Sequence, residues 1–203
     1  MKNNFLTLCI ATALLLLTGC SKDGDGPSDN DDFVSLYGSK PFKGEAKGQR
    51  LLNGQVNYNW EGEARIALME PTADSVSLLF LADFGDEGEI NFKIRGAYND
   101  GNFRAGESDP NSMFAINGNT LTGTIVNSSQ SMNFNGSFER EKASVAMRVE
   151  FLEEIGAFPK NAILNLTFET SRDMTTDNGE GCEMRLVPIW SPSGVTMGMV
   201  PDC

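Results

Sequence analysis

At 203 residues the chain has room for one domain, or for one domain with a small appendage. It carries 28 Asp and Glu residues and 16 Lys and Arg residues, so its net charge is negative. A negatively charged protein is repelled by the phosphate backbone of nucleic acids and by anionic lipid headgroups. The chain contains no histidine, which excludes His-assisted Ser or Cys nucleophiles, His-ligated zinc and imidazole proton shuttles. Carboxylate, lysine or tyrosine chemistry remains, or no catalysis at all.

Residues 1–19 predict an export signal. Lys2 lies in a short polar head, and the apolar run FLTLCIATALLLL follows from Phe5 to Leu17. As a helix this run would extend about 20 Å, which is shorter than the ~30 Å hydrocarbon core of a bilayer. The run is therefore typical of a cleaved signal peptide rather than of a transmembrane helix.

The signal ends in the motif Leu17-Thr18-Gly19-Cys20. This motif resembles the lipobox of bacterial lipoproteins. The resemblance implies cleavage before Cys20, a diacylglycerol on its thiol and, usually, a further acyl chain such as palmitate on the new amine. Two or three acyl chains anchor a protein stably, whereas one binds only marginally. The alternatives are an ordinary secretory signal that happens to contain a cysteine and a buried N-terminal helix.

Residues 20–32 predict a disordered tether behind the lipidated cysteine. The segment SKDGDGPSDNDD (21–32) has five Asp and no apolar residue, so it cannot bury anything. It resembles the acidic export segment of surface lipoproteins from anaerobic Gram-negative gut commensals, which implies the outer membrane and the cell surface. Lys22 interrupts the acidic run, so the periplasmic face stays open as an alternative.

The tether does not fit a calcium loop, although Asp23 and Asp25 have the spacing with which such a loop begins. Pro27 falls on the next ligand position, and Val34 stands where a bidentate Glu is required. The calcium-loop interpretation of the tether therefore fails, and no metal and no cofactor is assigned to the chain.

Residues 33–203 predict a single all-β domain. Apolar and polar residues alternate with a period of two, which is typical of strands with one buried face, in four segments: 90–95, 132–138, 145–151 and 164–169. More continuously apolar strands are expected at 65–69, 76–84, 114–116 and 121–126. Turn signals such as Asn53-Gly54 separate the segments, and only Glu153–Phe158 could form a short helical turn.

The spacing of strands and turns predicts about eight to ten antiparallel strands. So many sequential strands must close or fold on themselves, because long open edges promote aggregation. Short turns favour a closed up-and-down meander barrel over an immunoglobulin-type sandwich. Gly96, Gly123 and Gly136 interrupt strand patterns, where a bulge or a sharp bend would use them.

The segments FKIRGAY (92–98) and MNFNGSF (132–138) each combine a strand with a glycine and an aromatic residue. Over roughly residues 40–170 the pattern resembles calycin-like barrels, whose best-known members are lipocalins and avidins, and the calycin-like domains of secreted commensal lipoproteins. The resemblance implies a closed barrel. The lipocalin Gly-x-Trp motif is not recognisable, so no lipocalin ligand chemistry is implied.

Two cysteines remain once Cys9 leaves with the signal and Cys20 takes lipid. Cys182 and Cys203 form an even pair in an oxidising, extracytoplasmic setting, which favours a disulfide. The bridge would close a loop of about twenty residues, which contributes roughly 3 kcal/mol by loop entropy. It would pin the C-terminal segment, including Trp190, onto the barrel. Two free thiols are the alternative.

Tyr58 and Trp60 alternate on one predicted strand (VNYNW) and form the candidate ligand-binding site. They could line a cup in the mouth of the barrel or face a sugar, and core packing is the alternative. Separately, Asp74-Ser75-Val76 resembles the O-glycosylation site of the same commensals, which implies a glycan on Ser75.

The Gly-rich turn DFGDEGE is the candidate for carboxylate chemistry. It could bind a cation or supply the carboxylate pair of a glycoside hydrolase, and a solvated acidic loop is the alternative. Its acidic residues are Asp83, Asp86, Glu87 and Glu89.

The predicted anchor indicates a lipoprotein of the outer membrane or the cell surface. The predicted barrel contains no histidine and no recognisable set of catalytic residues. This barrel is expected to bind a small ligand, a glycan or a protein without catalysis, and no catalytic residue is assigned. One alternative is a carboxylate-dependent enzyme acting on glycans, and another is a pilus-like assembly subunit that pairs strands. The expected partners are the membrane, through the lipid, and an unidentified ligand; nucleic acid is not expected.

Overall fold

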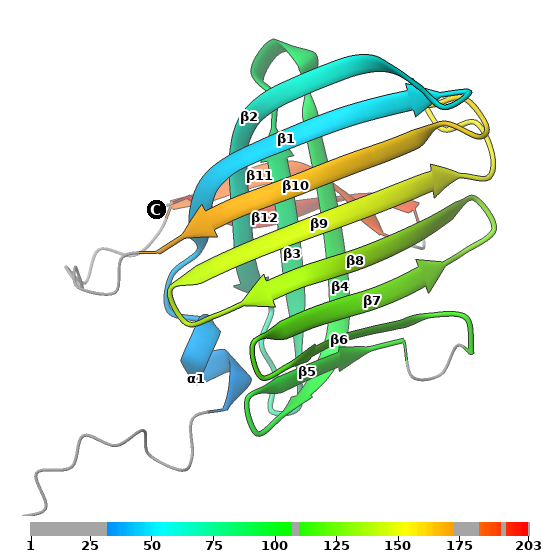
Figure 1. Cartoon of the computed structure of the whole chain (residues 1–203). Helices are drawn as coiled ribbons and strands as arrows, with labels where there is room; N and C mark the ends of the chain where they lie inside the picture. The colour runs from blue at the N-terminus through cyan, green and yellow to red at the C-terminus, as the bar shows by residue number, and fades with distance from the viewer. Residues whose placement is uncertain (1–31, 107–109, 173–182, 192–193, 203) are drawn as a thin grey trace, which may run out of the picture.

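The computed structural model describes residues 32–106, 110–172, 183–191 and 194–202. Ten antiparallel strands run up and down in chain order and close into a barrel (Figure 1). The all-β meander barrel predicted from the sequence is thus confirmed. The barrel strands are β1 (Phe42–Leu52), β2 (Gln55–Met69), β3 (Ser75–Asp83), β4 (Glu89–Asn99), β5 (Asn102–Ala105), β6 (Met113–Asn117), β7 (Thr120–Val126), β8 (Gln130–Phe138), β9 (Lys142–Phe151) and β10 (Ile163–Ser171).

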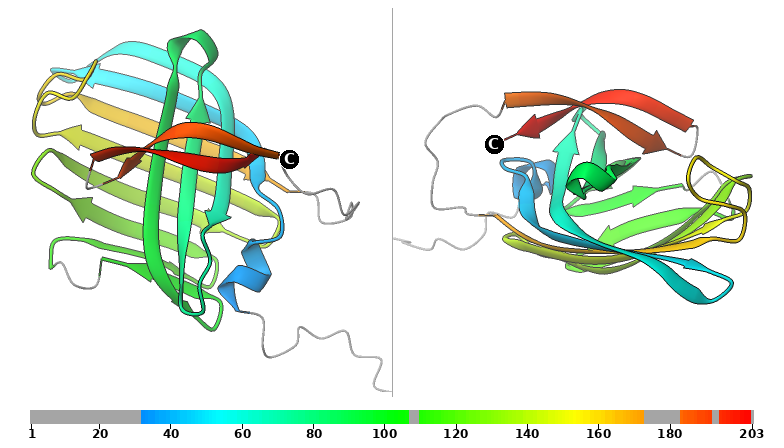
Figure 2. Two further views of the ribbon diagram at one scale, coloured as in Figure 1. Left: turned by 180° about the vertical axis from the view of Figure 1, so that it is seen from behind. Right: turned by 90° about the horizontal axis from the view of Figure 1, so that it is seen from above.

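Tight turns join the hairpins where the sequence places Asn-Gly and Asp-Gly. Asn53 and Gly54, between β1 and β2, have φ values of 52° and 78°, and Asp100 and Gly101, between β4 and β5, have 47° and 74°. Two successive positive φ values match the twist of the flanking strands. The β1–β2 hairpin is long, and its tip projects beyond the barrel wall (Figure 2).

The barrel closes where the first strand, β1, pairs with the last strand, β10, and its shortest seam lies between β4 and β5. Residues 89–97 of β4 all pair with β3, whereas only 97–99 pair with β5. Gly96 permits the strands to converge there, because a Cβ at this position would lie 2.3 Å from the carbonyl oxygen of Arg104. Gly136 does the same between β8 and β9, where a Cβ would lie 2.1 Å from the carbonyl oxygen of Ser144. The register continues through Gly136 on both sides, so this glycine marks a close backbone approach rather than a bulge.

Phenylalanine side chains fill the interior of the barrel. Phe80 on β3 meets rings from three other strands, at centroid distances of 5.8 Å to Phe168, 6.2 Å to Phe134 and 6.3 Å to Phe114. Phe80, Phe114 and Phe168 are completely buried. Rings from opposite walls therefore touch across the middle, as expected for a close-packed core.

A short helix, α1 (Phe33–Tyr37), closes one end of the barrel. Asp32 caps it, with its carboxylate accepting a hydrogen bond of 2.7 Å from the Ser35 backbone N–H. Phe33 is completely buried, and Tyr37 stacks edge-on to Phe138 at 4.9 Å. The sequence analysis missed this helix because five residues are too few to show a helical period.

The helical turn expected at Glu153–Phe158 does not form. These residues make a non-helical turn between β9 and β10, in which Ile155 and Phe158 exchange backbone hydrogen bonds of 2.9 Å. Phe158 stacks on Phe151 at 4.5 Å, so packing onto the end of β9 decides the local conformation. Among the residues that the structure describes, no helix is long and apolar enough to cross a membrane.

The remaining strands, β11 (Glu183–Ser191) and β12 (Gly194–Asp202), form a hairpin that crosses the outside of β3 and β4 (Figure 2). One parallel backbone bridge, between Trp190 and Phe92, joins β11 to the barrel. A second apolar cluster of Met69, Leu79 and Leu81 is buried on this outer wall.

Candidate functional site

The predicted pair Tyr58 and Trp60 lies at the end of the barrel opposite α1. β1 starts at Phe42, whose ring lies 5.1 Å from Phe138 near the helix, and runs away from it toward the β1–β2 turn. Ala64 faces the lumen, and Trp60 and Tyr58 continue the same alternate face of β2 toward the turn. Trp60 thus packs against the edge of the core, and Tyr58 reaches the rim at this end of the barrel.

We name this surface the aromatic rim and define it as Arg50, Tyr58, Trp60 and Phe84. Tyr58 stacks on Trp60 with centroids 5.8 Å apart and an interplanar angle of 11°, and Trp60 contacts Phe84 at 5.9 Å. The guanidinium carbon of Arg50 lies 4.2 Å from the centroid of the Tyr58 ring. Tyr58 is nevertheless 49% exposed, so the stack presents one large aromatic side chain to solvent.

Four chain segments hold the aromatic rim in place. Arg50 and Tyr58 are cross-strand partners on β1 and β2, and Phe84 follows β3. Arg50 also donates a hydrogen bond of 2.8 Å to the carbonyl oxygen of Ala157, in the β9–β10 connection. This bond fixes the guanidinium above the tyrosine, so the cation–π contact is geometrically defined.

Gly48 makes room for the tryptophan. It is the cross-strand partner of Trp60, and a Cβ on it would lie 3.0 Å from Trp60 Cε3 and 3.1 Å from Phe84 Cζ. The small residue on β1 therefore lets the indole and the Phe84 ring come close to this strand. Sequence reasoning found the two aromatic residues but missed Arg50, because a regular Asn53-Gly54 hairpin would place Asn57 opposite it, and only the register shift between Arg50 and Leu51 brings Tyr58 there.

The carboxylates of the acidic turn DFGDEGE stabilise the turn itself and form ion pairs with β11. Asp83 accepts a hydrogen bond of 2.9 Å from the Gly85 N–H, and both Asp83 and Glu89 pair with Arg185 of β11, at 3.7 Å and 3.2 Å. Asp86 and Glu87 lie exposed on the 3-10 turn Gly85–Glu87. In the described part of the chain no group of three or more Asp, Glu or Cys is placed to hold a metal ion.

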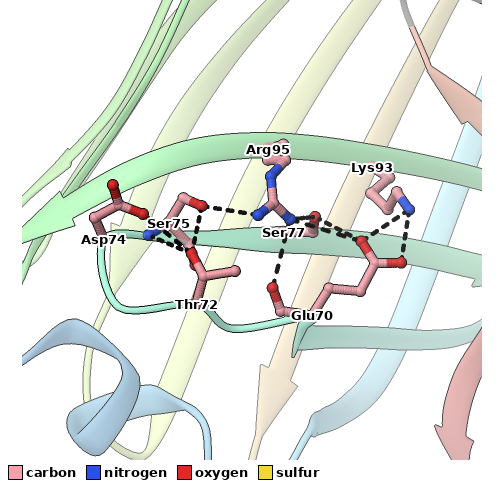
Figure 3. A network of polar contacts seen from close by, with 7 residues as sticks. All are labelled: Glu70, Thr72, Asp74, Ser75, Ser77, Lys93 and Arg95. Carbon is pink, nitrogen blue, oxygen red and sulfur yellow. Dashed lines mark hydrogen bonds and ion pairs between the residues drawn. The ribbon is translucent and has the colours of Figure 1, made fainter.

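Ser75 opens β3 within a polar network on the outer wall (Figure 3). Its hydroxyl accepts a hydrogen bond of 2.8 Å from Arg95 and lies 2.8 Å from the Thr72 hydroxyl. Glycosylation of Ser75 therefore stays a prediction, and it would displace the Arg95 contact.

Glu70 is the acidic centre of the same network. Lys93 Nζ lies 3.2 Å from its carboxylate and Arg95 Nη1 lies 3.8 Å away (Figure 3). Burial raises the pKa of Glu70, but the hydrogen bond and charge of Lys93, the Ser77 hydroxyl and the charge of Arg95 outweigh it, so the pKa is lowered.

The three cysteines with predicted covalent roles, Cys20, Cys182 and Cys203, lie outside the described residues. The sequence neighbours of Cys182 and Cys203 are nevertheless described. β11 begins at Glu183 and β12 ends at Asp202, and these two residues pair with each other at the open end of the hairpin.

Comparisons of this chain with protein-family models, with curated proteins and with solved structures find no match. Functional inference therefore depends on the geometry of the barrel and of the aromatic rim.

Proposed function

We propose that this protein is a lipid-anchored lipoprotein of the outer membrane, exposed at the cell surface, and that its barrel binds a glycan at the aromatic rim without catalysis. The observation that carries the proposal is Tyr58, stacked on Trp60 under Arg50 and still 49% exposed. A flat aromatic surface suits the C–H face of a pyranose ring, and a guanidinium beside it can donate hydrogen bonds to sugar hydroxyl and carboxylate oxygens.

The filled lumen supports an external ligand. Phe80, Phe114 and Phe168 occupy the middle of the barrel, where a hollow ligand-binding barrel would have its cavity. A glycan chain is a suitable external ligand, because it can lie along the rim without entering the core.

The position of α1 supports an orientation relative to the membrane. α1 begins at Phe33, directly after the predicted tether, and the aromatic rim lies at the other end of the barrel. A tether of residues 21–32 reaches at most about 40 Å when extended. Lipid on Cys20 would therefore keep the α1 end near the membrane and leave the rim facing outward.

Binding of oligosaccharides to the detergent-solubilised full chain, measured by titration calorimetry across a panel of neutral and acidic glycans, tests the glycan proposal. Tyr58→Ala should weaken binding about tenfold or more, because it removes the stacking surface and leaves Arg50 without its ring. Met113→Ala is the control, since Met113 is 64% exposed on the outer wall and should not change binding. Binding that ignores Tyr58→Ala, or no binding across the panel, contradicts the proposal.

Labelling with an alkyne analogue of palmitate, followed by membrane fractionation, tests the anchor. Wild-type protein should carry the label and sediment with the outer membrane, and Cys20→Ala should lose both properties. Protease added to intact cells should degrade the wild-type barrel if it faces outward. An unlabelled wild-type protein would refute lipidation.

Strand pairing with another protein is the second candidate function. The strand order ends at β12, which among the described strands pairs with β11 alone. Its outer edge could accept a strand, whereas the barrel itself is closed. Concentration-dependent assembly in light scattering, abolished by shortening the β11–β12 hairpin, would favour this function over glycan binding.

A further inference from the structure

A groove of about 370 Å³ lies on the outer wall of the barrel, beside the β11–β12 hairpin. We name it the hairpin groove. Lys43, Glu63, Arg65 and Asp83 line it from β1, β2 and β3, and Arg185 lines it from β11. These barrel residues lie on the outer face of their strands, whereas the aromatic rim continues the inner face of β2. The hairpin groove is therefore separate from the aromatic rim.

The charges in the hairpin groove form two adjacent rows of opposite sign. Lys43 is the cross-strand partner of Arg65, and Glu63 is the cross-strand partner of Asp83. Like charges directly opposite each other destabilise a sheet unless something compensates them. Arg185 compensates Asp83, at 3.7 Å.

Lys43 and Glu63 remain available to a ligand. Both side chains are exposed, and neither makes a hydrogen bond or an ion pair with another residue in the part of the chain that the structure describes. They are diagonal neighbours, because Glu63 stands two residues from Arg65, the partner of Lys43. Diagonal neighbours on one face of an antiparallel pair lie about 7–8 Å apart.

The geometry points to a binding site for a zwitterionic peptide of dipeptide size. The Lys43 ammonium would bind the terminal carboxylate, and the Glu63 carboxylate would bind the terminal ammonium. The termini of an extended dipeptide are about 7 Å apart, and Lys43 and Glu63, whose Cα atoms have a similar separation, carry flexible side chains that can reach one terminus each. The volume of the groove is within the range of small-molecule sites, about 300–1,000 Å³.

The floor of the hairpin groove offers strand backbone to a ligand. Gly44, Ala64 and Leu81 form it between the charged residues. Ala64 turns its side chain into the lumen and Gly44 has none, so from outside both present backbone, and Leu81 adds an apolar side chain. A ligand can therefore lie along these strands while its two termini reach the charged side chains.

NMR titration of the full chain with L-alanyl-L-alanine tests the inference. We expect saturable shifts of groove residues with a dissociation constant on the order of 1 mM, since the site is partly open to water. Lys43→Gln and Glu63→Gln should each weaken binding about tenfold. The matched controls are Lys47→Gln and Glu61→Gln, an exposed cross-strand pair of opposite charge that does not line the groove.

Capped peptides assign each terminus to its side chain. N-acetyl-L-alanyl-L-alanine lacks the ammonium, so Glu63→Gln should no longer weaken its binding while Lys43→Gln still does. L-Alanyl-L-alaninamide should show the reverse pattern. The inference is overturned if the dipeptide does not bind at 20-fold the expected constant, if both capped peptides bind as tightly as the free one, or if the control substitutions weaken binding equally.

Discussion

Arg172, the residue that follows β10, fastens the closed end of the barrel. It is 7% exposed, and its guanidinium donates hydrogen bonds to the carbonyl oxygens of Leu36, Tyr37 and Arg140, the last at 2.5 Å. The same group lies 4.5 Å from the centroid of the Phe42 ring. Burial, and then the charge of Arg140, lower the pKa of Arg172, but an arginine remains protonated at neutral pH. One cation thus joins α1, β1 and the β8–β9 turn.

Arg172→Met should lower the free energy of unfolding by about 2–4 kcal/mol, because buried carbonyl groups lose their charged donor. Urea unfolding followed by tryptophan fluorescence measures the loss. Arg148→Met is the matched control, since Arg148 is exposed on the outer face of β9 and should change stability by less than about 0.5 kcal/mol. Equal stability of the two variants would show that Arg172 does not hold α1.

Glu70→Gln should make stability less dependent on pH on the acid side. The folded pKa of Glu70 is lowered, so its carboxylate stabilises the fold above its ordinary pKa of about 4.3, and this contribution disappears as pH falls through the folded pKa. The side chain is 56% exposed, so the difference at pH 7 should be below about 1 kcal/mol. Urea unfolding of both proteins between pH 3 and pH 7 checks this, and a gap that widens toward low pH would contradict it.

At the scale of elements, strands in which apolar and polar residues clearly alternate were predictable from the sequence. The strands β1, β11 and β12 were not. The predicted segments at 132–138, 145–151 and 164–169 fall within β8, β9 and β10. β1 was missed because two of its inward positions are Ala46 and Gly48, which give no apolar signal although both are buried. β11 and β12 were missed because they pack on the outer wall rather than in the core, so their pattern does not report a buried inner face.

Gly136→Ala should destabilise the barrel by more than about 2 kcal/mol, because the new Cβ would collide with the carbonyl oxygen of Ser144 on β9. Gly118→Ala is the comparison. Gly118 has a φ of 54° with no atom within 4 Å of an added Cβ, so only backbone strain of about 1 kcal/mol is expected. Thermal melts by circular dichroism rank the two, and a milder effect at Gly136 would show that the β8–β9 contact can relax.

At the scale of the whole molecule, the C-terminal hairpin is an attachment to a complete barrel. The ten barrel strands close on themselves where β1 pairs with β10, and among the described contacts the hairpin joins the barrel through the Trp190–Phe92 bridge and the ion pairs of Arg185. The predicted bridge between Cys182 and Cys203 would link the two strands of the hairpin covalently, one residue beyond the paired Glu183 and Asp202.

Protein isolated without reductant should therefore have no titratable thiol at Cys182 or Cys203, and reduction should lower its midpoint of thermal unfolding. Loop entropy predicts a loss of roughly 3 kcal/mol. The Cys182→Ser, Cys203→Ser double variant should match the reduced wild type and ignore reductant. Two free thiols in unreduced protein would show that the disulfide does not form.

The sequence by itself determined the all-β class, the meander order and the expectation of an anchor, because alternation, turn chemistry and the lipobox are local signals. It also singled out Tyr58 and Trp60. Only the tertiary structure decided which end of the barrel is closed, that phenylalanines fill the lumen, and that Arg50 lies over Tyr58. The hairpin groove likewise arises from the register of β1, β2 and β3 and from the docking of β11. These features depend on contacts between residues far apart in the chain, which no local pattern encodes.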